Sequence, residues 1–583
     1  MPSLGKMLLC SGALLCSSVL AGCAGNPTSE AHLDTLMDQA WQLQLTRDPQ
    51  LAQRFGDEAA ASRLPDLSPA TLAAQQALAE ALLDRATELD PAQLDTEQQA
   101  DLSMLRYQLQ DQVDRYHYGA HTMPISAESG FYAYIASFAR GTRLQTPQQT
   151  QAYLDRLAAL PDYFDQQTRW MRQGLSSGHT LPRVVLDGLE QSIAAFITTP
   201  EQSLYYQPLV PLEDESAKAR GLALIRDGVI PAYRAFYHFF VNEYRPGARE
   251  SIAATALPNG EAFYANRVRH YTTLEMDAEE VHQLGLSEVA RIRAEMAAVI
   301  ADVGFEGSFA EFLAYLRTDP RFYPDSPDEL LRYAAYLAKQ ADAMLPRFFA
   351  TLPRTPYGIK PVPAEIAPKY TTGRYAGPSA DDQPGYYWVN TYALDKRPLY
   401  EMEALTLHEA VPGHHLQIAL SQEMPLHPLR RFSYISAFGE GWGLYAEKLG
   451  LEGGFYQDPY SNFGRLTYEM WRAARLVVDT GMHAKGWSRQ QAIDFLAANT
   501  ALSLHNVTTE IDRYIGWPGQ ALSYKIGELT LWRLRRDAEQ ALGAEFDLRQ
   551  FHDQLLSAGS LPLPQLQQRI EDWIQQRREG TAS

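Results

Sequence analysis

The sequence predicts a mainly α-helical fold with a small β-sheet next to one helix that carries a His-Glu pair. Apolar residues recur at three- and four-residue steps through most of the chain, first over residues 32–120, which is typical of amphipathic helices. Residues 351–392 differ because they are rich in Pro, Gly, Tyr and Thr. That interval ends in GYYWVNTY, whose aromatic and β-branched residues favour an extended strand shortly before His408 and Glu409.

The chain begins with the parts of a bacterial lipoprotein signal peptide. Lys6 supplies a positive start, and residues 7–20 form an apolar stretch that is too short to span a membrane. The sequence LAGC then ends at Cys23 and resembles a lipobox, in which the peptide is cut before a cysteine that becomes lipidated. We therefore predict residues 1–22 as signal peptide and residues 23–31 as the lipidated cysteine with a polar tether. The alternatives are an ordinary signal peptide and a short anchor helix.

The residue after the predicted lipidation site bears on where the protein resides. Ala24 follows Cys23, whereas the usual signal for inner-membrane retention has Asp at that position. We expect a cell-envelope lipoprotein, held by lipidated Cys23 at the periplasmic face of the outer membrane of a Gram-negative bacterium. All three cysteines lie in the leader or at its cut, so the mature chain can form neither an internal disulfide nor a cysteine-metal site.

Composition and charge exclude other classes of protein. Hydrophobic residues make up 45% of the chain and charged residues 21%, which is typical of a globular rather than a disordered protein. The formal net charge is -19, so the chain lacks the basic surface that nucleic-acid binding requires. We therefore expect no nucleic-acid partner.

Further helical segments follow along the chain. One of them begins with a Thr-Pro pair at Thr146, which is a favourable helix start. No regular repeat suggests a solenoid and no break in composition divides the mature chain, so we predict a single domain over residues 32–583. The other helical segments predicted from periodicity are 146–160, 326–345, 490–501 and 562–577.

The stretch HEAVPGHH, residues 408–415, begins like the helix of a zinc protease and then departs from it. Such helices carry a second histidine four residues after the first, but here that position holds Pro412. In a regular helix, His414 and His415 would lie about 9 and 10 Å from His408 along the axis. Two nitrogens on one zinc ion lie only about 3.3 Å apart, so a regular helix excludes both pairs.

Pro412 and Gly413 supply a deformation that removes this difficulty. Proline cannot donate the helical hydrogen bond to the carbonyl of His408, and glycine tolerates backbone angles that other residues avoid. Together they predict a bulge that absorbs two extra residues and places His414 as the second ligand. His415 is the ligand if the bulge absorbs three residues; otherwise we expect it to contact the ligands without binding the metal. The simpler interpretation is that Pro-Gly ends a helix and that the histidines are surface residues.

A third ligand is available in FSYISAFGEGWGLYAEKL, residues 432–449. Glu440 lies there among small and aromatic residues, and an acidic side chain in an apolar setting needs a partner such as a metal ion. Glu447 follows two helical turns later on the same face. We assign Glu440 as the third ligand and Glu447 as the residue that orients a ligand histidine.

Several stretches together resemble the bacterial domain-of-unknown-function 885 family, namely HEAVPGHHLQ, GEGWGLYAE, RLVVDTGMHAKGWS and WPGQALSYKIGE. The resemblance is dense over about 366–530, and FARGTRLQTPQQTQAYLDRL fits it earlier in the chain. That family is grouped with helical zinc metallopeptidases of the gluzincin type, such as the thimet-oligopeptidase and angiotensin-converting-enzyme types. The resemblance implies a two-lobed helical metallopeptidase-like body, Zn2+ as cofactor, and site roles for His408, Glu409, His414 and Glu440.

The expected chemistry follows from a zinc ion with three protein ligands, which leaves one coordination position open. Glu409 follows the first ligand directly and is the predicted general base, with a solvated helix charge as the alternative. The developing oxyanion needs further hydrogen-bond donors. We expect His483, oriented by Asp479, or Tyr524 to supply one. The alternatives are an ion-pair ladder with Arg475 and a packed aromatic ring.

These observations predict zinc-dependent hydrolysis of peptide bonds in short peptides by a lipid-anchored metallopeptidase. The alternatives are a metal-dependent amidase or esterase that acts on non-peptide substrates, and a lipoprotein that binds peptides without catalysis. Intact ligands and an intact base favour an enzyme. A deep cleft, as in the related peptidases, would exclude folded proteins, and the strand at 385–392 would hold an extended peptide by strand addition.

Overall fold

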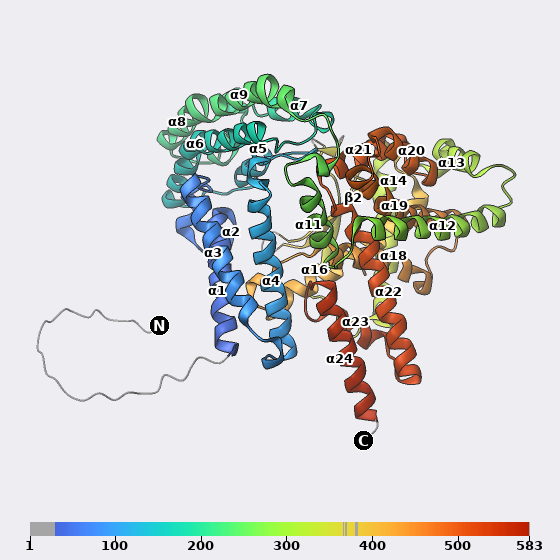
Figure 1. Ribbon diagram of the computed structural model, residues 1–583. Helices are drawn as coiled ribbons and strands as arrows, with labels where there is room; N and C mark the ends of the chain where they lie inside the picture. Colours follow the sequence, from blue (N-terminus) through green and yellow to red (C-terminus); the bar gives the residue numbers. More distant parts are fainter. Residues whose placement is uncertain (1–28, 365, 368–369, 379–382, 582–583) are drawn as a thin grey trace, which may run out of the picture.

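Helices make up most of the computed structural model, which describes residues 29–364, 366–367, 370–378 and 383–581 (Figure 1). The predicted leader and Cys23 lie outside these residues. The helices of the first half are α1 Ser29–Arg47, α2 Pro49–Arg54, α3 Pro69–Glu88, α4 Thr96–His117, α5 Phe131–Ile135, α6 Pro147–Ser177, α7 Leu189–Ala194, α8 Glu215–Leu224, α9 Ile230–Phe239, α10 Arg245–Gly247 and α11 Gly260–Thr272. Those of the second half are α12 Ala278–Asp302, α13 Phe309–Thr318, α14 Pro327–Phe348, α15 Met402–Glu409, α16 His414–Glu423, α17 Pro428–Arg431, α18 Ser436–Gly453, α19 Pro459–Ala484, α20 Arg489–Asn499, α21 Leu504–Gly516, α22 Ser523–Leu542, α23 Leu548–Leu556 and α24 Leu563–Thr581.

The helices begin where the sequence supplies caps for their free N–H groups. At the start of α6, the Thr146 side chain accepts from the N–H of Gln149, whose side chain accepts from the N–H of Thr146 in return. Pro147 occupies the first turn, where no helical N–H bond is lost. This start is the one predicted from Thr-Pro. In contrast, α1 already begins at Ser29, inside the predicted tether.

The strands β1 Tyr357–Pro361, β2 Gly373–Ala376 and β3 Gly385–Val389 form one sheet in the order β1-β3-β2. β3 pairs in parallel with β1 and antiparallel with β2, so the predicted strand at GYYWV exists. The expectation that this strand lies at an edge is wrong, because β3 has partners on both sides. β1 and β2 are the edge strands, and an edge strand can accept an extended peptide.

A hydrophobic core joins the two halves of the chain. It extends from Leu33 in α1 to Trp573 in α24, and a second, smaller cluster lies between α12, α13 and α19. α1–α9 lie on one side of the molecule and α12, α18, α19 and α22 on the other, with α11 between them (Figure 1). α19 packs along α12, and α18 packs along α22. Within the described residues, no helix has both the length and the apolar character needed to cross a membrane.

Candidate metal centre

The turn between α15 and α16 brings two histidines together. α15 ends at Glu409, α16 begins at His414, and the turn between them contains a cis Val411–Pro412 peptide bond. A Cβ at Gly413 would lie 1.9 Å from the carbonyl oxygen of His408, so only glycine fits there. The predicted bulge within one continuous helix is therefore wrong in form: the helix stops and a new one starts. The effect is the predicted one, because His414 returns to the side of His408.

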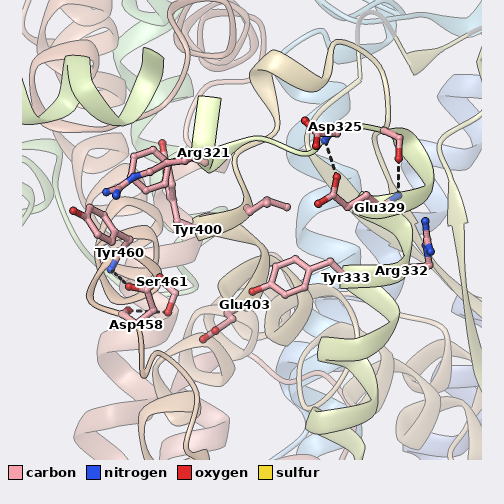
Figure 2. A pocket seen from close by; sticks show the side chains of 13 residues that line it. Arg321, Asp325, Glu329, Arg332, Tyr333, Tyr400, Glu403, Asp458, Tyr460 and Ser461 are labelled. Carbon is pink, nitrogen blue, oxygen red and sulfur yellow. Dashed lines mark hydrogen bonds between the residues drawn. The ribbon is translucent and has the colours of Figure 1, made fainter. Parts of the chain in front are cut away.

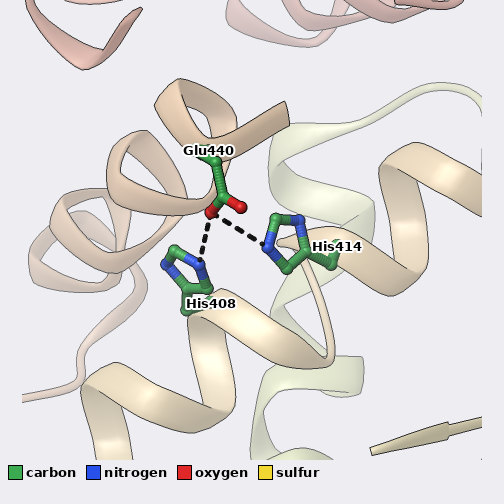
Figure 3. Close-up of side chains that lie close together, drawn as sticks. All are labelled: His408, His414 and Glu440. Carbon is green, nitrogen blue, oxygen red and sulfur yellow. Dashed lines mark ion pairs between the residues drawn. The ribbon is translucent and has the colours of Figure 1, made fainter. Parts of the chain in front are cut away.

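His408, His414 and Glu440 form the candidate metal centre, which we call the triad (Figure 3). Each offers one ligand atom, and these atoms all lie within 4.8 Å of one another. The Nε2 atoms of His408 and His414 each lie 3.5 Å from Oε2 of Glu440, on α18. A tetrahedral zinc ion with bonds near 2.0–2.1 Å places its ligand atoms about 3.3–3.5 Å apart, so the donor set fits zinc in chemistry and in spacing.

Glu447 orients His408 as predicted from the sequence. Its Oε1 lies 2.8 Å from Nδ1 of His408, so the proton on Nδ1 is held there and Nε2 is left to face the triad. Gly443 provides the space, since a Cβ at that position would lie 2.5 Å from Cε1 of His408. Burial alone would lower the pKa of His408, but the carboxylates of Glu440 and Glu447 outweigh it and raise the pKa to about 9.

Glu409 lies beside the triad with one carboxylate oxygen held in place. Its Oε2 accepts a hydrogen bond of 2.7 Å from the backbone N–H of Tyr375 in β2. The side chain lines the same cavity as the triad. The small sheet, which lies next to α15, therefore fixes the orientation of the predicted base.

His415 points away from the triad. Its Nδ1 lies 3.0 Å from the hydroxyl of Tyr375, and its ring packs on Tyr357 with centroids 4.5 Å apart. Burial lowers the pKa of His415 to about 4. The geometry therefore brings His414 to the candidate metal centre, and His415 supports the sheet that holds Glu409.

His483 and Asp479 do not reach the site, which corrects their expected roles. His483 is fully buried; its Nδ1 accepts from the N–H of Ala254 at 3.0 Å, and its Nε2 donates to the carbonyl of Tyr514 at 3.0 Å. Both ring nitrogens are thus used within the fold, and none remains for a substrate. Asp479 accepts from the hydroxyl of Tyr264 at 2.7 Å instead of orienting His483.

Among the tyrosines that line the cavity, Tyr524 and Tyr434 are our candidate oxyanion donors. Tyr524 lines the cavity, with the Arg475 guanidinium 4.1 Å from its ring centre. Tyr434, which the sequence analysis missed, also lines the cavity, and its ring lies 6.3 Å from that of His414. In the sequence, only Gly439 hinted at this position of Tyr434. The Tyr434 ring packs so close to residue 439 that a Cβ there would lie 2.2 Å from it, so a glycine is needed.

A cavity of about 550 Å³ surrounds the triad, Glu409 and both tyrosines. Its size is within the range of pockets for small ligands. A larger groove of about 1000 Å³ contains Arg321, Glu329 and Tyr460 among its lining residues (Figure 2). None of the triad residues lines that groove, so the smaller cavity is the candidate active site.

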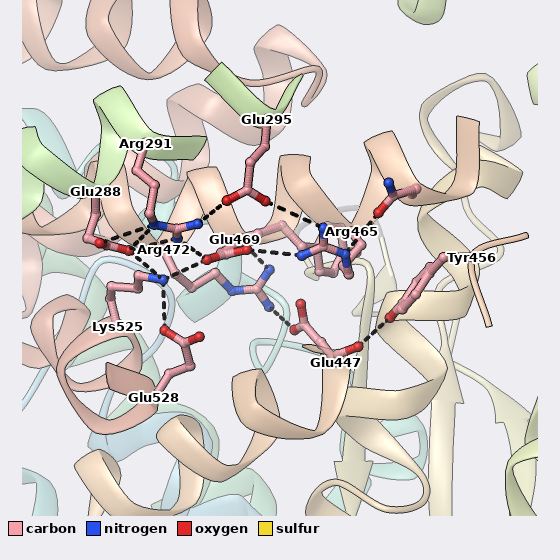
Figure 4. Close-up of polar contacts among 12 residues, drawn as sticks. Glu288, Arg291, Glu295, Glu447, Tyr456, Arg465, Glu469, Arg472, Lys525 and Glu528 are labelled. Carbon is pink, nitrogen blue, oxygen red and sulfur yellow. Dashed lines mark hydrogen bonds and ion pairs between the residues drawn. The ribbon is translucent and has the colours of Figure 1, made fainter. Parts of the chain in front are cut away.

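A second buried polar group, which we call the charge cluster, lies nearby on α12, α19 and α22 (Figure 4). Nζ of Lys525 lies 3.0 Å from Glu288, 2.8 Å from Glu469 and 2.7 Å from Glu528. Burial would lower the pKa of Lys525, but these three carboxylates hold it above its usual value. Arg465 completes the pairing of Glu469 at 3.0 Å.

These features define a helical protein with a buried His-His-Glu group in a small cavity. The family model described as "Bacterial protein of unknown function (DUF885)" matches residues 49–570, so the chain belongs to this family, as the motifs indicated.

Two solved structures share the fold. "The crystal structure of the putative lipoprotein from Colwellia psychrerythraea" is 28% identical with a TM-score of 0.87, over 94% of this chain and 100% of that one. "The structure of a putative lipoprotein of unknown function from Shewanella oneidensis" is 18% identical with a TM-score of 0.73, over 93% of this chain and 99% of that one. No curated protein matches the chain.

Proposed function

We propose that the protein is a zinc-dependent peptidase that hydrolyses short peptides, built on a two-lobed helical metallopeptidase-like body. The observation that carries the proposal is the convergence of His408, His414 and Glu440, whose ligand atoms lie within 4.8 Å of one another beside Glu409. A zinc ion held by these residues supplies a Lewis acid that polarises a carbonyl group and activates water.

The residues around the triad have separate tasks in this reaction. Glu447 keeps Nε2 of His408 directed at the triad through the contact at Nδ1. Glu409 has one oxygen fixed by the N–H of Tyr375, and its other oxygen takes the proton of the attacking water and passes it to the leaving amine. The hydroxyl of Tyr524 or Tyr434 donates to the developing oxyanion.

The edge strand β2 supports an extended peptide as substrate. Gly373, Arg374 and Tyr375 line the cavity, and β2 pairs only with β3 within the sheet. A peptide that adds to this edge places its backbone beside Glu409. A cavity of about 550 Å³ suits short peptides and excludes folded proteins.

Metal analysis and peptide turnover test the proposal together. The full chain, purified in detergent, should contain zinc and cut a quenched-fluorescent peptide library, and chelation should abolish both properties. The Glu409→Gln variant should keep its zinc and lose turnover, which separates catalysis from metal binding. Efficient cutting of native folded proteins would contradict the enclosed cavity.

A metal-dependent amidase or esterase is the second candidate, because the size of the cavity suits small non-peptide substrates equally well. Turnover of such amides or esters by zinc-loaded protein that cuts no peptide would select this candidate. Peptide binding without any turnover would instead indicate a non-catalytic lipoprotein.

We also propose that the protein is anchored in the cell envelope through a lipidated Cys23, at the periplasmic face of the outer membrane. LAGC follows the apolar leader directly, and the two solved structures compared above are described as lipoproteins. Mass spectrometry of the membrane fraction should find an acylated N-terminal Cys23. A mature protein that starts at another residue would contradict the anchor.

A further inference from the structure

Arginines line the cavity in addition to the triad and Glu409. Arg374 comes from β2, Arg472 and Arg475 come from α19, and Arg513 comes from α21. Buried or enclosed cations normally have acidic partners, so the pairing of each guanidinium shows how much positive charge is left for a ligand.

Two of these arginines, Arg475 and Arg513, share a single acid. Nη2 of Arg475 lies 3.0 Å from Oε2 of Glu510, and Nη2 of Arg513 lies 3.3 Å from the same oxygen. One carboxylate cannot neutralise two guanidinium groups. Arg472, in contrast, lies 3.4 Å from Glu447 and is thereby paired with the residue that orients His408.

Arg475 carries a second indication of a ligand. Its side chain is 3% exposed, and its Nη1 has no hydrogen-bond partner among the described residues. A buried N–H of a charged group without a partner is unfavourable. The cavity wall therefore contains both an excess of positive charge and an unused donor.

Arg374 lies in the strand that holds Glu409. It is exposed, it directly precedes Tyr375, whose N–H holds Glu409, and no acidic side chain forms an ion pair with it in the described part of the chain. Glu128 lines the same cavity without such a pair. Glu447 pairs Arg472, and Glu409 and Glu440 are the proposed base and metal ligand; of the charged lining residues that are left, Arg374, Arg475 and Arg513 outnumber Glu128 and Glu510 by one.

We propose that this cavity holds the free C-terminal carboxylate of a short peptide against Arg374, with Arg475 and Arg513 adding to the positive field. The proposal rests on the peptidase function above. A guanidinium group matches a carboxylate with two parallel hydrogen bonds. Arg374 is adjacent to Tyr375, whose N–H holds Glu409, and one extended residue spans about 3.3–3.6 Å; we therefore expect a carboxylate at Arg374 to lie one or two residues from the bond next to Glu409.

The protein would then release single residues or dipeptides from C-terminal ends. Water adds to the carbonyl carbon, the C–N bond breaks, and Glu409 passes the proton to the amine of the released fragment. The products are a shortened peptide with a new carboxylate and a free amino acid or dipeptide.

Matched peptides that differ only at the C-terminus test this inference. Each sequence is offered to the zinc-loaded full chain as the free acid, as the amide, and as an amide with Glu near the cut bond. The free acid should be cut more efficiently in kcat/KM by a factor on the order of ten to a hundred, as expected for hydrogen bonds to a charged group.

The variants assign the preference to one residue. Arg374→Gln should lower kcat/KM for the free acid only and remove the preference, whereas Arg374→Lys should retain part of it. Arg332→Gln is the matched control, because Arg332 is an exposed arginine of α14 paired with Asp328 outside this cavity, and it should leave the preference unchanged. Unaltered thermal unfolding of Arg374→Gln shows that its fold is intact.

A binding measurement separates this inference from the peptidase proposal. Calorimetric titration of the Glu409→Gln variant should show tighter binding of the free acid than of the amide, and Arg374→Gln in that background should abolish the difference. Equal cutting and equal binding of acid and amide would overturn the inference, as would a preference for the amide with internal Glu. Zinc-loaded protein that cuts no peptide but still binds the free acid preferentially would overturn the peptidase proposal alone.

Discussion

The triad, on α15, α16 and α18, and the charge cluster, on α12, α19 and α22, are both enclosed by helices, yet they are built differently. In the charge cluster, Lys525 contacts three carboxylates, and each charge finds its partner inside the protein. In the triad, two imidazoles and the Glu440 carboxylate direct electron-pair donors to one point. The cluster is complete with protein atoms, whereas the triad has the composition of a metal site.

The triad and the charge cluster also differ in whether they line a cavity. Lys525 and Glu469 line neither the cavity of about 550 Å³ nor the groove of about 1000 Å³. The triad lines the former together with Glu409. A buried charge therefore indicates function here only when it also faces a cavity, and Lys525, close in sequence to Tyr524, belongs to the structural group.

The largest expected effect is the loss of metal from the triad. His408→Ala, His414→Ala and Glu440→Ala should each reduce zinc, measured by inductively coupled plasma mass spectrometry, from one ion per chain to almost none. His415→Ala should retain most of it, because His415 contacts Tyr375 and Tyr357 instead. The reverse order for the two adjacent histidines would identify His415 as the ligand.

Loss of the base should affect turnover almost as strongly while sparing the metal. Glu409→Gln keeps the side-chain size and removes the proton acceptor, so kcat should fall by about a hundredfold to ten-thousandfold. Steady-state kinetics together with zinc content measure both effects. Activity that survives this change would assign the base to another residue.

Removing a partner from the charge cluster should lower the stability of the fold and leave the chemistry of the triad unchanged. Lys525→Met leaves Glu528 without its cation and removes one of the cations of Glu469 and Glu288, so it should reduce the free energy of unfolding by about 3–5 kcal/mol. Lys485→Met is the control, since its ion pair with Glu279 is exposed to solvent and should contribute little to stability. Urea denaturation of both variants gives the comparison, and equal values would show that the cluster is not structural.

The tyrosines of the cavity should influence the transition state more than substrate binding. Tyr524→Phe or Tyr434→Phe should lower kcat by about a hundredfold or more and change KM little, whichever hydroxyl serves the oxyanion. Comparison of the two variants identifies the donor. A rise in KM with unchanged kcat in both would assign these rings to substrate binding alone.

The smallest effect should follow from loosening one ligand without removing it. Glu447→Gln weakens the contact of 2.8 Å with Nδ1 of His408, and zinc affinity should decrease about tenfold to a hundredfold. Competition with a chelator of known affinity measures the change. Full loss of zinc would place Glu447 among the ligands.

Much of the fold could be predicted because local signals agree with it. Thr146-Pro147 marks the start of α6, and GYYWV forms β3. The residues of the triad were also identifiable, because Pro412 and Gly413 predicted an interruption of the regular helix after His408. The exact form of that change was not predictable, since it depends on the carbonyl of His408 that Gly413 approaches.

The missed residues are those whose roles depend on distant parts of the chain. His483 looked available, but Ala254 and Tyr514 occupy its two nitrogens. Arg374 looked like an ordinary strand residue, and only the packing of β2 beside Glu409 gives it importance. Such contacts join segments far apart in sequence, and no local pattern records them.

The crossing of α18 and α22 fixes the register of the active site. A Cβ at Gly441 would lie 2.6 Å from Cα of Gly527, and one at Gly527 would lie 2.0 Å from the carbonyl oxygen of Ala437. Each residue of a helix adds about 1.5 Å and 100°. An insertion of one residue between Tyr524 and Gly527 would therefore turn the tyrosine away from the cavity while the contact between the two glycines stays in place.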